Sequence, residues 1–375
     1  MNAILALEDG TIFEGKAFGA TGTSTGEACF NTNAVGYQEI LTDPAYAGQM
    51  VAMTYPHIGN YGICEEDNES SRPHVRGFVI GELSRIHSNW RANEPLGDWM
   101  ARHGIMGIQD VDTRKLTTIL RTKGAQRACL TTELDAAAAV KAAQESAPLQ
   151  GTDLVSGVTT AEPYHWEGES RVWKLPNKLQ GDMGYYTELP PVESKVVAYD
   201  FGIRRNLLRH LRRQGMDVTV VPAGTPAETV LAMGPDGIFL STGPGDPAVL
   251  TAIHAEVKKL AESGIPVFAA GLGMQLLAHA FGARTEHLPH GHRGGQASKH
   301  TATGDIAITA GCQAFTVVAD SLPAGLEATH TNLTDGTVEG IRHTALPVFG
   351  VQYSPEGTEH FSQFAEMVRS AKAAK

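Results

Sequence analysis

The segment Pro266–Leu277 has the layout of a nucleophile elbow, a sharp strand-to-helix turn that presents a reactive side chain. Val267 and Phe268 predict a buried strand, small residues follow them, and a helix is expected to begin at Leu272. The residue at the tip of the turn is Gly271, which has no side chain. The sequence therefore predicts the scaffold of covalent catalysis without its nucleophile.

Two other places in the chain carry residue types that could act as nucleophiles. Cys312 has no histidine placed beside it by any motif, so we favour a buried small hydrophobe over a reactive thiol. Ser354 and Glu356 are separated by a proline, and no general base accompanies them. The histidines at 287, 290 and 292 are closely spaced, but we expect no metal site there.

The elements that would position the elbow alternate between strand and helix. Alternating strands and helices indicate an α/β fold with a doubly wound, mostly parallel sheet. Sites in such sheets lie beyond the carboxyl ends of the strands, where the Gly243–Gly245 loop and the Gly271 turn both fall. The strands are expected at 196–199, 216–221, 237–240 and 265–268, and the helices at 203–214, 226–233 and 249–263.

The whole chain divides into three segments of different residue composition. Residues 1–150 read as one β-rich domain with some helix, 151–194 as a linker that wraps around the protein, and 195–375 as the α/β domain. Trp166 and Trp173 favour a linker that packs on a surface. The arginines of helix 203–214 are expected to form a solvated face.

Composition excludes several classes of function. The 375-residue chain has a net charge of -11, which argues against a nucleic-acid partner. Its four cysteines form no CxxC pair, so we expect a reducing compartment without disulfides or zinc. The sequence has neither a signal peptide nor an apolar run long enough to span a membrane. These features together predict a cytoplasmic protein.

Several motifs resemble one family, the small glutaminase subunit of carbamoyl-phosphate synthase, over nearly the whole chain. They are Gly36–Pro44, Thr54–Asn60, Asp110–Thr117, Ala198–Gly202, Gly237–Pro247 and Gly291–Gly295. The resemblance implies a domain peculiar to this subunit, followed by a class I glutamine amidotransferase domain. It also implies that the subunit hydrolyses glutamine and passes ammonia to a large subunit, which makes carbamoyl phosphate for arginine and pyrimidine synthesis.

The resemblance further implies a hetero-oligomer with the large subunit. We expect this chain to bind no cofactor of its own, because ATP and Mg belong to the large subunit. Glutamine or a related amide is a possible further ligand.

The catalytic triad that the resemblance implies is broken. Gly271 stands at the position of the cysteine nucleophile, and Met274 replaces the histidine that follows it. Ser354 stands at the position of the histidine base, whereas the carboxylate that orients this base survives as Glu356. A carboxylate cannot orient a base that is absent, and loss of nucleophile and base together leaves no covalent route.

The glutamine pocket that the resemblance implies has also changed. A serine from the first domain is Ala45 here, and an asparagine–histidine–glycine–phenylalanine segment reads Cys312–Phe315. The implied pocket positions are Ala45, Gly243, Gly245, Leu272, Gln275, Cys312, Ala314 and Phe315.

These departures lead to four hypotheses. The first is a small chain that has lost glutaminase activity, so that its partner uses free ammonia. The second is a stand-alone regulatory module that binds an amide or amino acid in the altered pocket. The third is an amidotransferase with an active site rebuilt around Cys312, and the fourth is an altered site in an otherwise normal family member.

Overall fold

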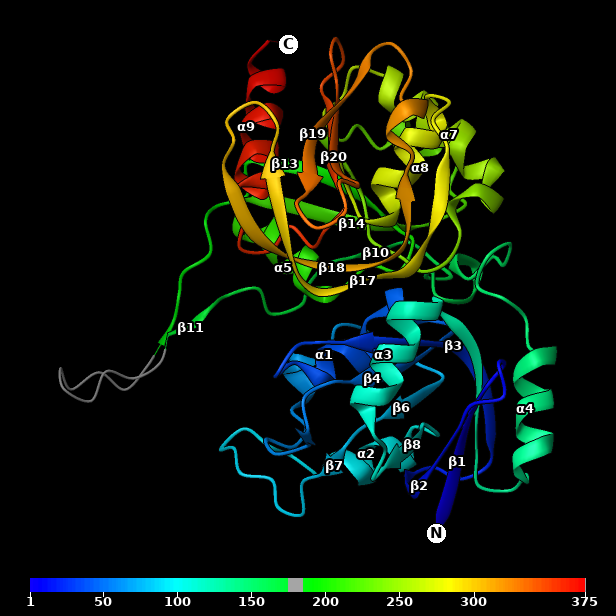
Figure 1. Cartoon of the computed structure of the whole chain (residues 1–375). Helices are drawn as coiled ribbons and strands as arrows, with labels where there is room; N and C mark the ends of the chain where they lie inside the picture. Colours follow the sequence, from blue (N-terminus) through cyan, green and yellow to red (C-terminus); the bar gives the residue numbers. More distant parts are fainter. Residues whose placement is uncertain (175–184, 375) are drawn as a thin grey trace.

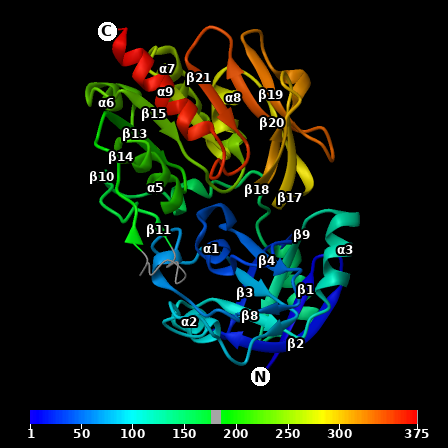
Figure 2. The ribbon, with the colours of Figure 1, turned by 90° about the vertical axis from the view of Figure 1, so that its left-hand side faces the viewer.

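The computed structural model describes residues 1–174 and 185–374. The chain forms two stacked bodies, a barrel from the first third of the sequence and a sheet covered by helices from the second half (Figure 1). Figure 2 shows the same two bodies after a quarter turn.

The first body is a closed barrel with strand order β1-β2-β8-β6-β4-β3-β9. Apolar side chains fill it because alternate residues of each strand point inward. Its strands are β1 (Asn2–Leu7), β2 (Ile12–Gly19), β3 (Thr23–Asn31), β4 (Gln49–Met53), β6 (Gly77–Val79), β8 (Met106–Gln109) and β9 (Gln126–Thr131). A small pair, β5 (His57–Ile58) and β7 (Glu82–Leu83), stands beside it.

Four helices accompany the barrel: α1 (Tyr37–Thr42), α2 (Leu96–Arg102), α3 (Thr113–Lys123) and α4 (Ala136–Glu145). Asp112 is the N-cap of α3, because its carboxylate accepts the backbone N–H of Lys115 at 2.8 Å. Helix α4 lies in an alanine-rich segment, and its N-cap is Asp135.

The second body is a ten-stranded sheet with order β10-β14-β13-β15-β16-β21-β20-β19-β17-β18. Its strands are β10 (Tyr164–His165), β13 (Ser194–Asp200), β14 (Met216–Pro222), β15 (Gly237–Leu240), β16 (Val267–Ala270), β17 (Thr285–His300), β18 (Ile306–Val317), β19 (Leu326–Asn332), β20 (Val338–His343) and β21 (Val348–Val351). β13, β14, β15 and β16 run parallel, as predicted, and β21, which was not predicted, joins them in parallel. The sheet is mixed, because the remaining strands join it antiparallel.

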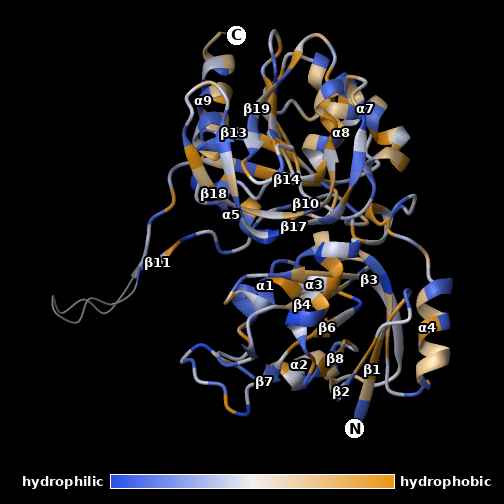
Figure 3. Ribbon diagram, in the orientation of Figure 1, coloured by the Kyte–Doolittle hydropathy of each residue, from blue (hydrophilic) through white to orange (hydrophobic). Residues whose placement is uncertain are grey.

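Helices cover both faces of the parallel strands, so the predicted doubly wound arrangement is confirmed. One face packs on α6 (Ala227–Ala232), α7 (Thr251–Glu262) and α8 (Leu272–Ala280). The other face packs on α5 (Arg205–Arg213) and α9 (His360–Ala373). Figure 3 shows hydrophobic residues concentrated along β1 and α8, and α8 is buried along almost its whole length.

The predicted wrapping linker is partly in contact with the second body. Trp166 packs against its core, and Tyr164 and His165 add the edge strand β10 to the sheet. Further on, β11 (Trp173–Lys174) pairs with β12 (Tyr185–Tyr186), and the rings of Trp173 and Tyr186 lie 4.9 Å apart. Residues 175–184 of this linker lie outside the described residues.

The arginines of α5 are not a solvated face, which corrects the sequence analysis. Arg209 donates to the backbone carbonyls of Glu66 and Glu169, at 2.9 and 3.2 Å. Arg212 and Arg213 donate to the carbonyls of Pro190 and Ser170. These carbonyls come from the linker and the first body, so the arginines hold both against the sheet.

Candidate functional site

Gly271 lies at the tip of the predicted elbow, between β16 and α8. Its backbone has φ 55° and ψ -117°, a conformation that glycine adopts freely and other residues adopt only with strain. Its N–H donates to the carbonyl of Val351 at 2.8 Å, which ties the turn to the neighbouring parallel strand β21. A Cβ built at Gly271 would lie 3.1 Å from the methyl group of Thr242. The elbow geometry is therefore retained although the side chain is absent.

Ser354 and Glu356 follow β21 and lie at the same edge of the sheet as Gly271. Both bind Arg204, the residue that precedes α5. Nη2 of Arg204 donates to Oγ of Ser354 at 2.9 Å, and it forms a short ion pair with Oε1 of Glu356. The side chains of Arg204 and Glu356 are each 14% exposed. The surviving carboxylate of the implied triad is thus paired with an arginine.

Arg204 also reaches the first body. Its Nε lies 3.9 Å from Oδ2 of Asp43, a buried carboxylate of the Gly36–Pro44 motif. Burial raises the pKa of Asp43 to about 6, although Arg204 and the N–H of Ala45 favour the charged form. Burial acts against the charge on Arg204, but Glu356 and Asp43 outweigh it and raise the pKa of this guanidinium. Arg204 therefore remains a cation that joins the two bodies at the degenerate triad.

All eight predicted pocket positions line one cavity beside the elbow. Four further residues that the sequence analysis did not single out complete its wall: Gln49, Arg293, Gln313 and Gln352. Gly271, Ser354 and Glu356 lie outside this wall. The structure therefore brings the implied pocket residues together, and Gly271 directly precedes one of them, Leu272.

The cavity is small, and polar side chains in its wall bind one another. Its volume is about 20 Å³, room for about one water molecule and far too little for free glutamine. Gln275 is already engaged, since its Nε2 donates to the carbonyl of Phe315 at 2.7 Å and to Oε1 of Gln352 at 3.0 Å. Nε of Arg293 donates to Oε1 of Gln49 at 3.3 Å, a contact across the two bodies.

Cys312 is poorly suited to act as a nucleophile. It lines the cavity and is partly buried, and this burial raises the pKa of the thiol well above its usual value. The carboxylate of Asp43 raises this pKa further, whereas the Arg293 guanidinium opposes the shift. Because the thiolate is the reactive form, this environment disfavours the site rebuilt around Cys312.

The three neighbouring histidines have separate structural partners. Nε2 of His292 lies 2.7 Å from Asp335, and its Nδ1 lies 3.4 Å from Glu339. Burial lowers the pKa of His292, but these two carboxylates outweigh burial and raise it. His287 pairs with Glu27 at 3.7 Å, and His290 stacks on Phe30.

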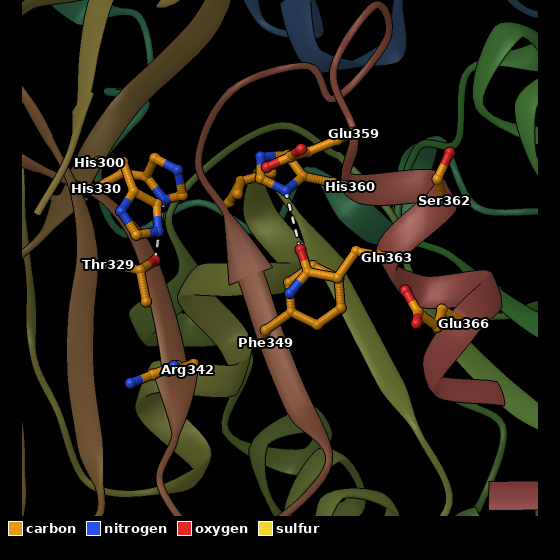
Figure 4. A pocket seen from close by; sticks show the side chains of 11 residues that line it. His300, Thr329, His330, Arg342, Phe349, Glu359, His360, Ser362, Gln363 and Glu366 are labelled. Atoms are coloured by element: carbon orange, nitrogen blue, oxygen red, sulfur yellow. Dashed lines mark hydrogen bonds between the residues drawn. The ribbon is translucent and has the colours of Figure 1, made fainter. Parts of the chain in front are cut away.

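A second, wider cavity of about 390 Å³ lies between β19, β20, β21 and α9 and shares no residue with the elbow cavity. His300 and His330 lie on one side of it, and Glu359 and His360 on the other (Figure 4). Burial and the neighbouring histidines lower the pKa of His330 to about 4, so this histidine is neutral near pH 7. In the described part of the chain, no group of three or more His, Cys, Asp or Glu side chains is arranged to hold a metal ion.

No helix in the described residues is long and apolar enough to cross a membrane.

Comparison with known proteins agrees with this architecture. Residues 5–130 match the family model "Carbamoyl-phosphate synthase small chain, CPSase domain", and residues 197–364 match "Glutamine amidotransferase class-I". A carbamoyl phosphate synthase small chain of Akkermansia muciniphila is 50% identical and covers 99% of each chain. The proteins of that name from Syntrophotalea carbinolica and Escherichia coli K12 are each 47% identical over 98% of each chain. Among solved structures, a glutamine amidotransferase from Thermotoga maritima matches 48% of this chain and 83% of its own, with 14% identity and a TM-score of 0.37.

Proposed function

This chain belongs to the family of carbamoyl phosphate synthase small chains, and from that premise we propose that it is a small chain without glutaminase activity. Its large partner would then use free ammonia to make carbamoyl phosphate. We propose further that the assembly is cytoplasmic, and that ATP and Mg are bound by the large partner and not by this chain.

One observation carries the proposal: the positions of the nucleophile and the base hold Gly271 and Ser354, on an otherwise retained elbow. Thiol-dependent hydrolysis needs a thiolate and a base that takes its proton. Ser354 cannot act as that base, and Glu356 is paired with Arg204. Removal of one triad residue already costs orders of magnitude in rate, and the remaining backbone donors have no covalent intermediate to stabilise.

Two features disfavour the alternatives. A cavity of about 20 Å³ is too small for an amino acid, which argues against a stand-alone amide sensor. The raised pKa of Cys312 argues against a rebuilt active site. The first body, in contrast, keeps its family motifs, although our proposal gives it no catalytic residue. Its retention therefore supports a role in assembly with the large subunit.

The proposal is tested with this chain co-expressed and co-purified with the large subunit encoded in the same genome. Carbamoyl phosphate formation is measured with ATP and bicarbonate, with either glutamine or ammonium as nitrogen source. We expect product with ammonium, and glutamine-dependent product at least about a thousandfold slower. The ammonium reaction on the same preparation controls for the integrity of the large subunit.

Product formed from glutamine at a rate similar to that from ammonium would refute the loss of glutaminase activity. Failure of the two chains to co-purify would refute the role in assembly. Glutamine hydrolysis that survives in a Cys312→Ala variant would also exclude the rebuilt site as its source.

A further inference from the structure

The cavity beside α9 has room for a small organic molecule. Its volume of about 390 Å³ lies within the range of ligand pockets, and it shares no lining residue with the elbow cavity. Residues of β17, β19, β20 and β21 form one wall, and residues of α9 and of the turn before it form the other (Figure 4). Two of the lining residues, Phe349 and Val351, are buried and apolar. The cavity therefore combines an apolar surface with polar walls.

The sheet wall carries groups that can bind a carboxylate. Arg342 lies on β20 with an exposed side chain, and its Nε binds the carboxylate of Glu327. Because a guanidinium has five N–H donors, it can bind a second carboxylate as well. Nδ1 of His300 accepts two backbone N–H groups of the turn after β17, at 3.3 and 3.2 Å. Nε2 of His300 therefore carries the proton and can act as a donor.

The helix wall carries two carboxylates that bind no cation of the described chain. Glu359 and Glu366 both line the cavity. They are seven residues apart, about two turns of helix, so they lie on the same side of α9. Neither side chain forms a hydrogen bond or an ion pair with any residue that the structure describes. Figure 4 shows both across the cavity from Arg342 and His300.

Two histidines of the cavity add no charge to it. Burial lowers the pKa of His330 to about 4 and also lowers the pKa of His360, so both are neutral near pH 7. Their rings lie 5.5 Å apart, and Nε2 of His360 lies 2.8 Å from the hydroxyl of Tyr353. The permanent charges of the cavity are therefore one guanidinium on the sheet wall and two carboxylates on the helix wall.

We propose that this cavity binds a zwitterionic amino acid with an apolar side chain. Arg342 and His300 hold its carboxylate, and Glu359 holds its ammonium group. Its side chain packs on Phe349. Opposite charges on opposite walls select a ligand that carries both signs, and the second carboxylate, of Glu366, disfavours an acidic side chain. The proposal goes beyond the loss of glutaminase activity and does not depend on it.

The first experiment titrates leucine into the purified full chain, followed by calorimetry and by saturation-transfer NMR of the leucine methyl groups. We expect binding with a Kd of about 1 mM or below. Isocaproate is leucine without its ammonium group, and isoamylamine is leucine without its carboxylate. Each should bind at least about tenfold more weakly, because each loses one charge-assisted contact. Glutamate should bind more weakly than leucine by a similar factor.

Three outcomes of this experiment would overturn the proposal. They are the absence of saturation transfer to leucine, equal binding of leucine and either analogue, and equal binding of leucine and glutamate.

Variants assign the binding to the cavity. Arg342→Gln and Glu359→Gln each remove one charge at an exposed position, so the fold should survive. Each should weaken leucine binding at least about tenfold. Glu262→Gln, at an exposed position of α7 outside the cavity wall, is the matched control and should bind leucine as the parent does.

The preference between ligands separates a charge contact from general damage to the cavity. In Glu359→Gln the preference for leucine over isocaproate should disappear, whereas a merely deformed cavity would weaken both ligands alike. Leucine binding that is unchanged in both Arg342→Gln and Glu359→Gln would place the ligand elsewhere and overturn the proposal.

Discussion

At the scale of single residues, Gly271 makes a prediction about stability. Its φ of 55° is strained for any residue with a Cβ, and the added atom would lie 3.1 Å from the methyl group of Thr242. We therefore expect Gly271→Cys to lower the free energy of unfolding by about 1–3 kcal/mol, measured by chemical denaturation. The variant should remain without glutaminase activity, because the cysteine gains no base.

Gly224→Cys is the matched control for this prediction. Gly224 is exposed, its φ lies outside the left-handed region, and an added Cβ would meet no atom within 4 Å. If both cysteine variants were equally stable, the strain that we assign to the elbow would be absent.

The residues of the cavity show what the sequence can and cannot predict. Resemblance alone assigns Ala45 and Cys312 to one pocket, and the structure does bring them together. Arg293 falls in a glycine-rich motif that gives it no role. No sequence pattern marks a buried arginine, because arginine is among the residues most often exposed. The ion pair of Arg204 with Glu356 escapes prediction because 152 positions separate the two residues.

At the scale of elements, helix α1 carries a carboxyl group that should make stability depend on pH. Burial raises the pKa of Glu39 from 4.5 to about 7, with smaller contributions of the same sign from Asp67 and Glu69. A pKa that is higher in the folded state gives stability that is fully present below about pH 4.5 and is lost as pH rises through about 7. Between pH 5 and pH 8 the parent should therefore lose roughly 2 kcal/mol of its free energy of unfolding through Glu39, and Glu39→Gln should not show this loss.

Urea denaturation at the two pH values measures this loss. Glu14→Gln, on an exposed position of β2, is the matched control and should keep the pH dependence of the parent. Asp43 also has a raised pKa, of about 6, so it too makes the protein less stable as the pH rises. Both variants retain this contribution. A Glu39→Gln chain as pH-dependent as the Glu14→Gln chain would exclude Glu39 as the cause.

In the second body, the positions of strands and helices are predicted more accurately than the contacts that their side chains make. The strand predicted at 237–240 coincides with β15, and α8 begins at Leu272 as expected, because both have strong local signals. The prediction that the arginines of α5 face solvent is wrong. These arginines donate hydrogen bonds to the backbone carbonyls of residues 66, 169, 170 and 190. Amphipathic periodicity cannot indicate a partner that lies far away in the sequence.

At the scale of the whole molecule, Glu69 couples the barrel to the sheet through the start of α5. Its Oε2 accepts the N–H of Asn206 at 2.9 Å, and its carbonyl accepts the N–H of Arg205 at 2.8 Å. A carboxylate from one body thus satisfies a donor at the positive end of a helix in the other. Glu69 is 5% exposed, so water cannot readily replace it.

We expect Glu69→Ala to lower Tm by about 2–4 °C in calorimetry, because loss of such a contact typically costs about 1 kcal/mol. Glu69→Gln keeps an acceptor for the N–H of Asn206 and should lose less. Glu14→Ala, at an exposed position of the barrel, controls for the loss of one negative charge from a chain of net charge -11. If Glu69→Ala unfolded at the temperature of Glu14→Ala, the side chain of Glu69 would contribute nothing measurable to holding the two bodies together. The same contacts fix the geometry of the elbow cavity, because Ala45 and Gln49 of the barrel form part of its wall.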